Sequence, residues 1–412
     1  MVFNTIEPAL LGHKVLELAA DRKNMVLGFA TAAGLLVALL SQPVVGALSD
    51  RVRSRWGRRL PILFIGTLLV VVALPLTALS PSLAALIPAL LMVYLATNIA
   101  QAPTQALIPD LVPERQRGIA AGFKATYDIL GLVLGRLISG ELVALGRVTE
   151  AAAASSAVFL LASGVTALAA REPSSPPPMD LEPIIGRSPK VSAGRLDLRG
   201  IWRATRRAYS IDWRAHPGFI PWFINRGLFW GAFVALNTFL LFYMMDVVGM
   251  EEAVAQRFIA RMFPLIGVAI MLVNLPSGWL ADRVGRRPML VLAGLLASGG
   301  TGMVLFLRSP LGIVAAGLVI GLGIGIFLSA NWAMITDIVP PGEAARYLGI
   351  ANMAAASGSF LARFAGGALI DPVNRMMGSQ TAGYLTLYVL TLLAFVVATA
   401  AVSRLPGRKL SP

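Results

Sequence analysis

Eleven apolar segments of about 20 residues or more follow one another along this chain, separated by short polar connections. An apolar helix of about 20 residues is long enough to cross the roughly 30 Å hydrocarbon core of a bilayer. With 57% hydrophobic and only 14% charged residues, the 412-residue chain has more apolar surface than a soluble core needs. We therefore predict an all-α polytopic membrane protein. The predicted spans are 25–48, 59–80, 83–108, 119–146, 150–170, 218–246, 254–280, 288–307, 310–335, 345–371 and 380–403.

Residues 1–20 form a further, partial candidate for a spanning helix. Glu7, His13, Lys14 and Glu17 interrupt an apolar run that is too short to span comfortably. The segment is no signal peptide, because it has neither a basic head before an apolar run nor a small-residue cleavage site. We expect it to be the second part of a first helix that begins before residue 1.

The longest polar stretch, residues 171–217, divides the apolar segments into two groups. It is rich in Pro and Ser at its start and in Arg and aromatic residues toward its end, which is typical of a cytoplasmic linker. The predicted domains are an N-terminal bundle of helices one to six (1–170), this linker, a C-terminal bundle of helices seven to twelve (218–404) and a cytoplasmic tail (405–412).

The net charge of +14 reports topology. If the connection 46–61 is cytoplasmic, alternation places the linker, the C-terminus and three shorter connections on the same side. These six segments hold 23 Lys and Arg, against 5 in the opposite loops. The bias predicts a multi-pass protein of the cell (inner) membrane with a cytoplasmic C-terminus, and it excludes nucleic acid as the partner that explains the basic residues.

Several kinds of chemistry have no residues to support them. The chain has no cysteine and only two histidines, 203 positions apart, so neither a disulfide nor a Cys/His metal site is expected. It also lacks a G-x-x-x-x-G-K-[ST] phosphate loop and any nucleophile–base constellation. We expect no enzyme activity, no cofactor and no metal.

A sequence repeat relates the two groups of helices. The stretch GALSDRVRSRWGRRLPILFIG at 46–66 recurs as GWLADRVGRRPMLVLAG at 278–294, and residues 109–140 match 336–367 without a gap. Both similarities have nearly the same offset, 228 for the paired arginines and 227 for the second segment, which indicates a duplicated six-helix unit. The pairs are Gly46 with Gly278, Asp50 with Asp282, Arg51 with Arg283, Arg58 with Arg286 and Arg59 with Arg287.

Six helices, a basic linker and six helices, with this motif between helices two and three of each half, resemble the major facilitator superfamily. The stretches SDRVRSRWGRRLP and PDLVPERQRG are most similar to its sugar–cation symporter branch, which includes the sucrose and melibiose types. The resemblance implies that each motif aspartate and its arginines latch the cytoplasmic side to the other half. The alternative is a topogenic basic loop with a solvated acid. Gly46 and Gly278 would let a neighbouring helix approach closely.

Polar side chains on four predicted helices are candidates for binding substrate. In 83–108, Tyr94, Asn98, Gln101 and Gln105 share one narrow helix face, which suits a polyhydroxylated ligand in a wet cavity. The alternative for this stripe is hydrogen bonding between helices, and for Trp222 it is an aromatic belt at the interface. The candidates on the other helices are Asn225 and Arg226 near Trp222, Asn331 and Trp332, and Asn352 and Arg363.

Charges inside the membrane are costly and therefore suggest function. Lys124 and Asp128 form an i,i+4 pair in the span 119–146, with Arg136 two turns further on. Asp128 is the preferred proton-coupling acid, and a static buried ion pair is the alternative. The acids Glu141, Asp246 and Asp371 lie near helix ends and are expected at the membrane interface. Melibiose-type cation binding uses acids in helix two, and 25–48 contains none, which favours protons or uniport over sodium.

Together these features predict a secondary active transporter that works by alternating access, as a monomer, and takes up a sugar or glycoside with protons. Two alternatives stay open. One is efflux of an amphipathic drug or metabolite by the same fold. The other is a non-transporting membrane receptor or scaffold, if the first helix is absent.

Overall fold

The computed structural model describes residues 9–52, 54, 56–57, 59–113, 116–170, 218–338 and 344–403, and in this part of the chain every regular element is a helix. The first group of helices is α2 (Leu11–Ala19), the 3₁₀ turn η2 (Ala20–Arg22), α3 (Lys23–Arg51), α4 (Leu60–Ala78), α5 (Leu83–Leu111), α6 (Arg117–Ala144) and α7 (Val148–Ala169). The second group is α9 (Phe219–Thr238), α10 (Leu240–Asp246), α11 (Glu252–Val284), α12 (Arg286–Phe306), α13 (Pro310–Ile338), α14 (Ala344–Met376) and α15 (Ala382–Ser403).

The predicted spans coincide with these helices, and the all-α membrane fold is confirmed. Ten helical stretches of the described residues are long and apolar enough to cross a membrane. One predicted span needs correction, because 218–246 is divided into α9 and α10 at Phe239. The linker 171–217 and the tail 405–412 lie outside the described residues.

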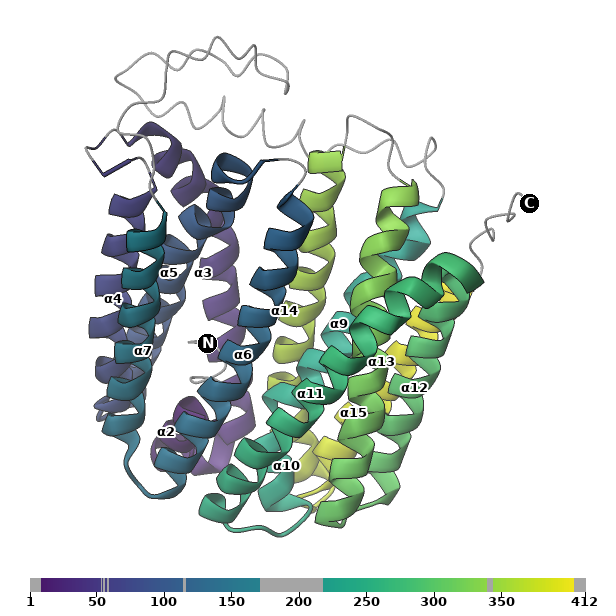
Figure 1. Ribbon diagram of the computed structural model, residues 1–412. Helices are drawn as coiled ribbons and strands as arrows, with labels where there is room; N and C mark the ends of the chain where they lie inside the picture. The colour runs from purple at the N-terminus through teal and green to yellow at the C-terminus, as the bar shows by residue number, and fades with distance from the viewer. Residues whose placement is uncertain are drawn as a thin grey trace, which may run out of the picture.

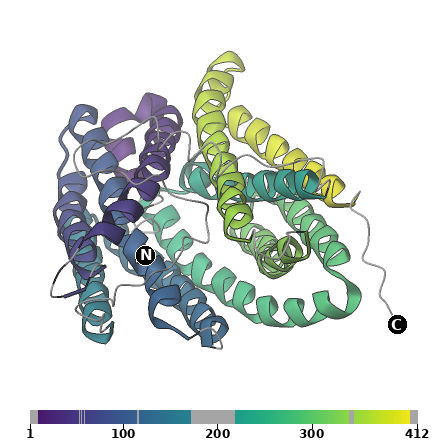
Figure 2. The ribbon, with the colours of Figure 1, turned by 90° about the horizontal axis from the view of Figure 1, so that it is seen from above.

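The helices form two groups that lie side by side. Figure 1 shows α2–α7, in purple, blue and dark teal, beside α9–α15, in teal, green and yellow, and the view from above in Figure 2 separates the same two groups. The most extensive contacts between the groups are those of α3 with α14 and of α6 with α11. The α6–α11 contact is close, because a Cβ on Gly140 would lie 2.5 Å from the Cβ of Ala260.

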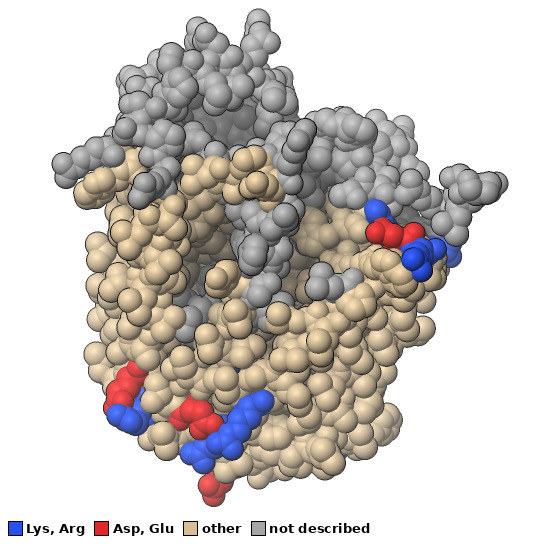
Figure 3. Space-filling view, viewed as in Figure 1, with Lys and Arg blue, Asp and Glu red and all other residues tan. Residues whose placement is uncertain are grey.

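The surface agrees with a membrane position. In Figure 3 the described charged side chains gather along the lower edge and at the upper right, with a wide band of other residues between them. Large apolar side chains are exposed on several helices, including Leu68 of α4, Leu161 of α7 and Leu272 of α11. Such an apolar belt between charged rims is what a lipid-facing surface requires.

Candidate functional site

The predicted polar stripe on α5 divides into a packed part and an accessible part. A methyl group on Gly34 of α3 would overlap the ring of Tyr94, so this ring fills the contact between α3 and α5. The buried Asn98 amide donates to the carbonyl of Tyr94 at 2.8 Å, within its own helix. These contacts are ring packing and a hydrogen bond within α5, so both the ligand role and the alternative of hydrogen bonding between helices stay predictions. Gln101 and Gln105 are exposed.

A second polar cluster joins α9 to α13, around a buried arginine. The guanidinium of Arg226, which is 8% exposed, donates through Nη1 to Asn331 Oδ1 at 2.6 Å. It also lies 4.6 Å from the ring centroid of Trp332 and 5.7 Å from that of Trp222. The Trp222 Nε1–H donates to the backbone carbonyl of Asn331 at 3.1 Å. Arg226 is therefore held between two indole rings and one amide.

Asn331 orients this cluster. Its Oδ1 accepts from Arg226, while its Nδ2 donates to Asn225 Oδ1 at 3.2 Å. Asn225 in turn donates to the carbonyl of Ala398 in α15 at 2.9 Å. Both amides are buried, but Trp332 is 38% exposed. Four predicted ligands, Asn225, Arg226, Asn331 and Trp332, thus lie together, and among them the ring of Trp332 is partly exposed.

The spacing of residues on α9 explains how this helix presents the cluster. Trp222, Arg226 and Phe229 are four and three positions apart, so they lie on one face of the helix. Phe229 stacks on Phe327 of α13 with ring centroids 3.8 Å apart, and it meets Phe395 of α15 edge-on at 5.0 Å. The aromatic contact fixes α9 against α13 one turn from Arg226.

The predicted residues Asn352 and Arg363 lie on α14, which packs against α9. Asn352 is exposed, and Arg363 is buried at 8%. The backbones of α14 and α9 approach closely, because a Cβ on Gly231 would lie 2.7 Å from the carbonyl oxygen of Gly358. α14 therefore borders the site as a neighbouring wall.

On α6, Arg136 reaches into the second group of helices. Its Nη2 donates to Asn237 Oδ1 of α9 at 2.9 Å, and its guanidinium lies 4.0 Å above the ring of Phe263 in α11. Arg136 is 2% exposed. The side chains of Lys124 and Asp128, also on α6, lie outside the described residues. A charged residue of the first half is therefore buried against the second.

The first copy of the repeated motif is described only in part. Arg59 is buried and donates to Ser49 Oγ at 3.2 Å, which ties the end of α3 to the start of α4. Around Gly46 a Cβ would meet no described atom within 4 Å, and the close approach of a neighbouring helix at this glycine stays a prediction. The side chains of Asp50, Arg51 and Arg58 lie outside the described residues.

The second copy makes its described contacts within the second half. Asp282 pairs with Arg286 at 3.8 Å, one turn along the chain. Arg286 also donates to the carbonyl of Ala333 in α13, and Arg287 to that of Ser403 in α15. A Cβ on Gly278 would lie 2.9 Å from Ser329 Oγ, so α13 approaches there as expected. Arg283 lies over Trp279, 3.7 Å from its ring centroid.

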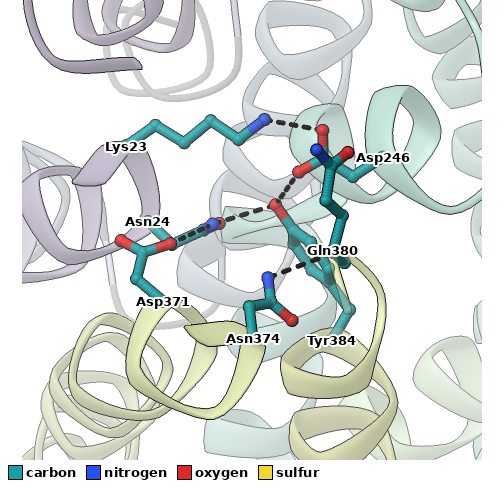
Figure 4. A network of polar contacts seen from close by, with 7 residues as sticks. All are labelled: Lys23, Asn24, Asp246, Asp371, Asn374, Gln380 and Tyr384. Carbon is teal, nitrogen blue, oxygen red and sulfur yellow. Dashed lines mark hydrogen bonds and ion pairs between the residues drawn. The ribbon is translucent and has the colours of Figure 1, made fainter. Parts of the chain in front are cut away.

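At the opposite end of the helices, sequence reasoning missed a polar network that joins the two halves (Figure 4). Asn24 Nδ2 donates to Asp371 Oδ1 at 2.8 Å and to the Tyr384 hydroxyl at 2.9 Å. The Tyr384 hydroxyl donates to Asp246 Oδ2 at 2.6 Å. Lys23 Nζ donates to the other oxygen, Asp246 Oδ1, also at 2.6 Å. Helices α3, α10, α14 and α15 therefore meet in one hydrogen-bonded chain.

Further contacts cross between the halves at the same end. Glu141 of α6 pairs with Arg261 at 2.9 Å and with Arg257 at 3.3 Å, both on α11. His13 Nδ1 of α2 lies 2.6 Å from Glu252 Oε1 at the start of α11. We call this end, where α3 begins and α14 ends, the closed end. The three acids expected at the interface, Glu141, Asp246 and Asp371, all bind the other half of the chain.

Metal ligands do not assemble in the described part of the chain. No group of three or more His, Cys, Asp or Glu side chains there is placed to hold an ion. The polar atoms of the α9–α13 cluster are instead amides, indoles and a guanidinium. Such groups recognise hydroxyls, carbonyls or anions through hydrogen bonds and ring stacking.

Comparison with solved structures supports the fold. A bacterial homologue of the human lysosomal transporter Spinster, solved in an inward-facing and occupied conformation, superposes with a TM-score of 0.70. The match covers 97% of this chain and 93% of that one, at 14% sequence identity. At this identity the likeness concerns the fold alone.

Curated relatives match shorter stretches. The general alpha-glucoside permease of Schizosaccharomyces pombe is 34% identical over 122 residues, 26% of this chain and 22% of the permease. The minor myo-inositol transporter IolF of Bacillus subtilis is 34% identical over 84 residues, 20% of this chain and 19% of its own. The sucrose transport protein SUT4 of Oryza sativa is 32% identical over 129 residues, again 26% and 22%. The chain thus matches about a fifth of each relative's length.

The family model called Major Facilitator Superfamily matches residues 15–362 and, in a second overlapping match, residues 259–411. Together these matches cover nearly the whole chain. Members of this family are transporters, in agreement with the expectation that the chain is not an enzyme. The sequence resemblance, the helical architecture and the family match lead to one conclusion: this chain belongs to the major facilitator superfamily and is a multi-pass membrane transporter.

Proposed function

We propose that the chain imports a sugar or glycoside together with protons. The observation that carries the proposal is the α9–α13 cluster, in which Arg226 lies between Trp222 and Trp332 and donates to Asn331. Aromatic faces stack on sugar rings, while a guanidinium and amides suit the hydroxyls. Similarity to an alpha-glucoside permease, an inositol transporter and a sucrose transporter supports the same substrate class.

Transport would proceed by alternating access around this cluster. In the described conformation the two halves are joined at the closed end, by Lys23 with Asp246, Asn24 with Asp371 and Glu141 with Arg261. The motif residues Asp282, Arg286 and Arg287 make their described contacts within their own half. We propose that the closed end faces the outside of an inner membrane, with the C-terminus in the cytoplasm, as the distribution of basic residues favours.

Coupling to protons is assigned to α6. Asp128 is the proposed coupling acid, with Lys124 and Arg136 on the same helix as the charges that influence it. Arg136 is buried against α9 and α11, so α6 is a helix on which a charge of one half already contacts the other. We propose that the chain functions as a monomer, because each half supplies the partner surface for the other.

Efflux of an amphipathic compound is the second candidate, and one cavity favours it. A cavity of about 70 Å³ lies within the second half, bordered chiefly by apolar side chains. Its lining includes Phe233, Met262, Phe263, Ile266 and Tyr388. An apolar group of a substrate would fit such a cavity better than a hydroxylated ring.

The deciding experiment is uptake into proteoliposomes of the purified protein. Radiolabelled maltose, sucrose and myo-inositol would each be offered with an imposed pH gradient, inside alkaline, and again without one. We expect at least one of them to accumulate only with the gradient. Failure of all three, together with gradient-driven extrusion of a hydrophobic dye, would replace the sugar proposal with the efflux candidate.

A further inference from the structure

The two halves meet along α6 and α11 and along α3 and α14, and we call these contacts the α6–α11 seam and the α3–α14 seam. At the closed end the polar side chains of the two seams differ in exposure. On the α6–α11 seam, the side chains of Glu141, Arg257 and Arg261 are 34%, 40% and 67% exposed. On the α3–α14 seam, Asn24, Asp371 and Tyr384 are 1%, 7% and 0% exposed. Water and salt weaken exposed ion pairs, whereas hydrogen bonds to a buried carboxylate are shielded from both while the end is closed. The buried seam is therefore the harder one to break.

Asp371 occupies a particular position on the α3–α14 seam. Its Oδ2 accepts the backbone N–H of Met25 at 2.8 Å, and its Oδ1 accepts Asn24 Nδ2 at the same distance. Lys23 is the first residue of α3, so the Met25 N–H is one of the groups in the first turn that lack a partner within the helix. α3 has no side-chain cap of its own. Asp371, supplied by α14 of the other half, acts as this cap.

A carboxylate at the beginning of a helix is favoured by both hydrogen bonding and the helix dipole. Here the cap and the capped helix belong to different halves, so the interaction exists only while the closed end is closed. Separating α3 from α14 would remove both donors from Asp371 in one movement. It would also remove the side-chain acceptor of the Met25 N–H.

The rest of the network connects this cap to two more helices. Asn24 donates its second amide hydrogen to Tyr384 of α15, which donates to Asp246 of α10. Lys23 completes the chain at Asp246 and also lies 5.2 Å from the ring centroid of Phe242. One short segment of α3, residues 23–25, thus binds α10, α14 and α15 together (Figure 4).

We propose that Asp371 is the latch of the closed end. It is a helix cap that α14 of one half supplies to α3 of the other, and its loss shifts the transporter toward the state that is open at this end. The α6–α11 ion pairs contribute less to holding this end closed. The consequence for flux rests on the proposed function, but the conformational shift does not. A test of the latch therefore requires a measurement of conformation that works without substrate.

The chain has no cysteine, which makes paired labelling straightforward. Leu145, after the end of α6, and Met377, after the end of α14, are 60% and 67% exposed and mark the two halves at the closed end. Both would be replaced by Cys and spin-labelled, and the distance between the labels measured by pulsed electron resonance in lipid. We expect Asp371→Asn to raise the ratio of open to closed molecules about tenfold, as for a lost hydrogen bond to a charged group.

Glu141→Gln is the matched control, because it removes the acid of the exposed seam. It should change the ratio by about twofold or less. Asn24→Ala, which removes the shared donor but leaves the Met25 N–H on Asp371, should open the end to an intermediate extent. It also serves as the test if Asp371→Asn does not fold, as judged by gel filtration. Unchanged distances in the folded Asp371 or Asn24 variant, or equal opening by Glu141→Gln, would overturn the latch.

The outcomes separate this proposal from the transport proposal. A distance shift without any sugar flux in the wild-type protein leaves the latch in place and removes the sugar assignment. Sugar flux in the wild-type protein with unchanged distances in the variants removes the latch alone.

Discussion

Gly28 of α3 and Gly367 of α14 meet backbone to backbone between the two halves. A Cβ on Gly28 would lie 2.6 Å from the Cα of Gly367 and 2.5 Å from the carbonyl oxygen of Arg363. Both neighbours are backbone atoms of a long helix, which cannot move aside as a flexible side chain would. The contact lies about one turn along α3 from Asn24 and on the same seam, so the close approach of the two helices and the Asp371 cap depend on each other.

Replacing Gly28 with Ala should therefore open the closed end. The added methyl group would push α3 from α14, lengthening the Asn24–Asp371 and Met25–Asp371 hydrogen bonds. We expect the label distance between positions 145 and 377 to shift as in Asp371→Asn. Gly299→Ala on α12 is the control, because a Cβ there meets nothing within 4 Å. A wild-type distance in a folded Gly28→Ala protein would show that the seam yields in another way.

If the α9–α13 cluster binds the sugar as proposed, the planar shape of the Arg226 side chain should matter. Arg226→Lys keeps the charge but loses the planar group that lies over Trp332 and donates to Asn331. We expect the affinity for the transported sugar to fall by about tenfold or more, with an unchanged elution volume on gel filtration. Titration calorimetry would measure it, with Arg257→Lys as the control on the exposed seam. Equal affinity in both variants would place the sugar elsewhere.

The sequence predicted the helices well because membrane spans depend on local properties. A long apolar run must satisfy its backbone hydrogen bonds within itself, so its length and composition suffice to predict a helix. The break at Phe239 escaped prediction because the span 218–246 is apolar as a whole, although the polar residues Asn237 and Thr238 directly precede the break. Contacts between helices depend on packing, which local composition does not encode.

The candidate site shows the same difference. Arg226 and Asn331 were both predicted as ligands, but their contact joins residues 105 positions apart. Lys23, Asn24 and Tyr384 were missed because polar residues at helix ends resemble ordinary interfacial residues. Only the approach of α3 to α14 shows that Asp371 caps a helix of the other half. The offset of the repeat could have pointed to the missed residues at the start of α3. It pairs the start of α3 with the start of α11, and at both starts one half of the chain meets the other.

Aromatic packing beside the α9–α13 cluster should contribute to the free energy of unfolding of the protein. Phe229 is 1% exposed and contacts Phe327 and Phe395, so Phe229→Ala would leave a cavity between α9, α13 and α15. We expect a loss of about 3 kcal/mol, the lower end for such substitutions, because lipid replaces part of the hydrophobic term. Unfolding in mixed micelles would measure it. Phe306→Ala, at a position 85% exposed, should change the stability by about 0.5 kcal/mol or less.

The final prediction concerns the proposed role of Asp128 in proton coupling. An amide of the same shape cannot carry a proton, so Asp128→Asn should abolish gradient-driven accumulation of the sugar. Counterflow exchange of labelled for unlabelled sugar moves no net proton and should therefore continue at a rate close to that of the wild-type protein. Both would be measured in the same proteoliposomes, with Glu150→Gln as the control, because Glu150 pairs with Arg147 on the exposed end of α7. Accumulation that survives in Asp128→Asn would transfer the coupling role to another acid, and loss of exchange as well would indicate a structural role for Asp128.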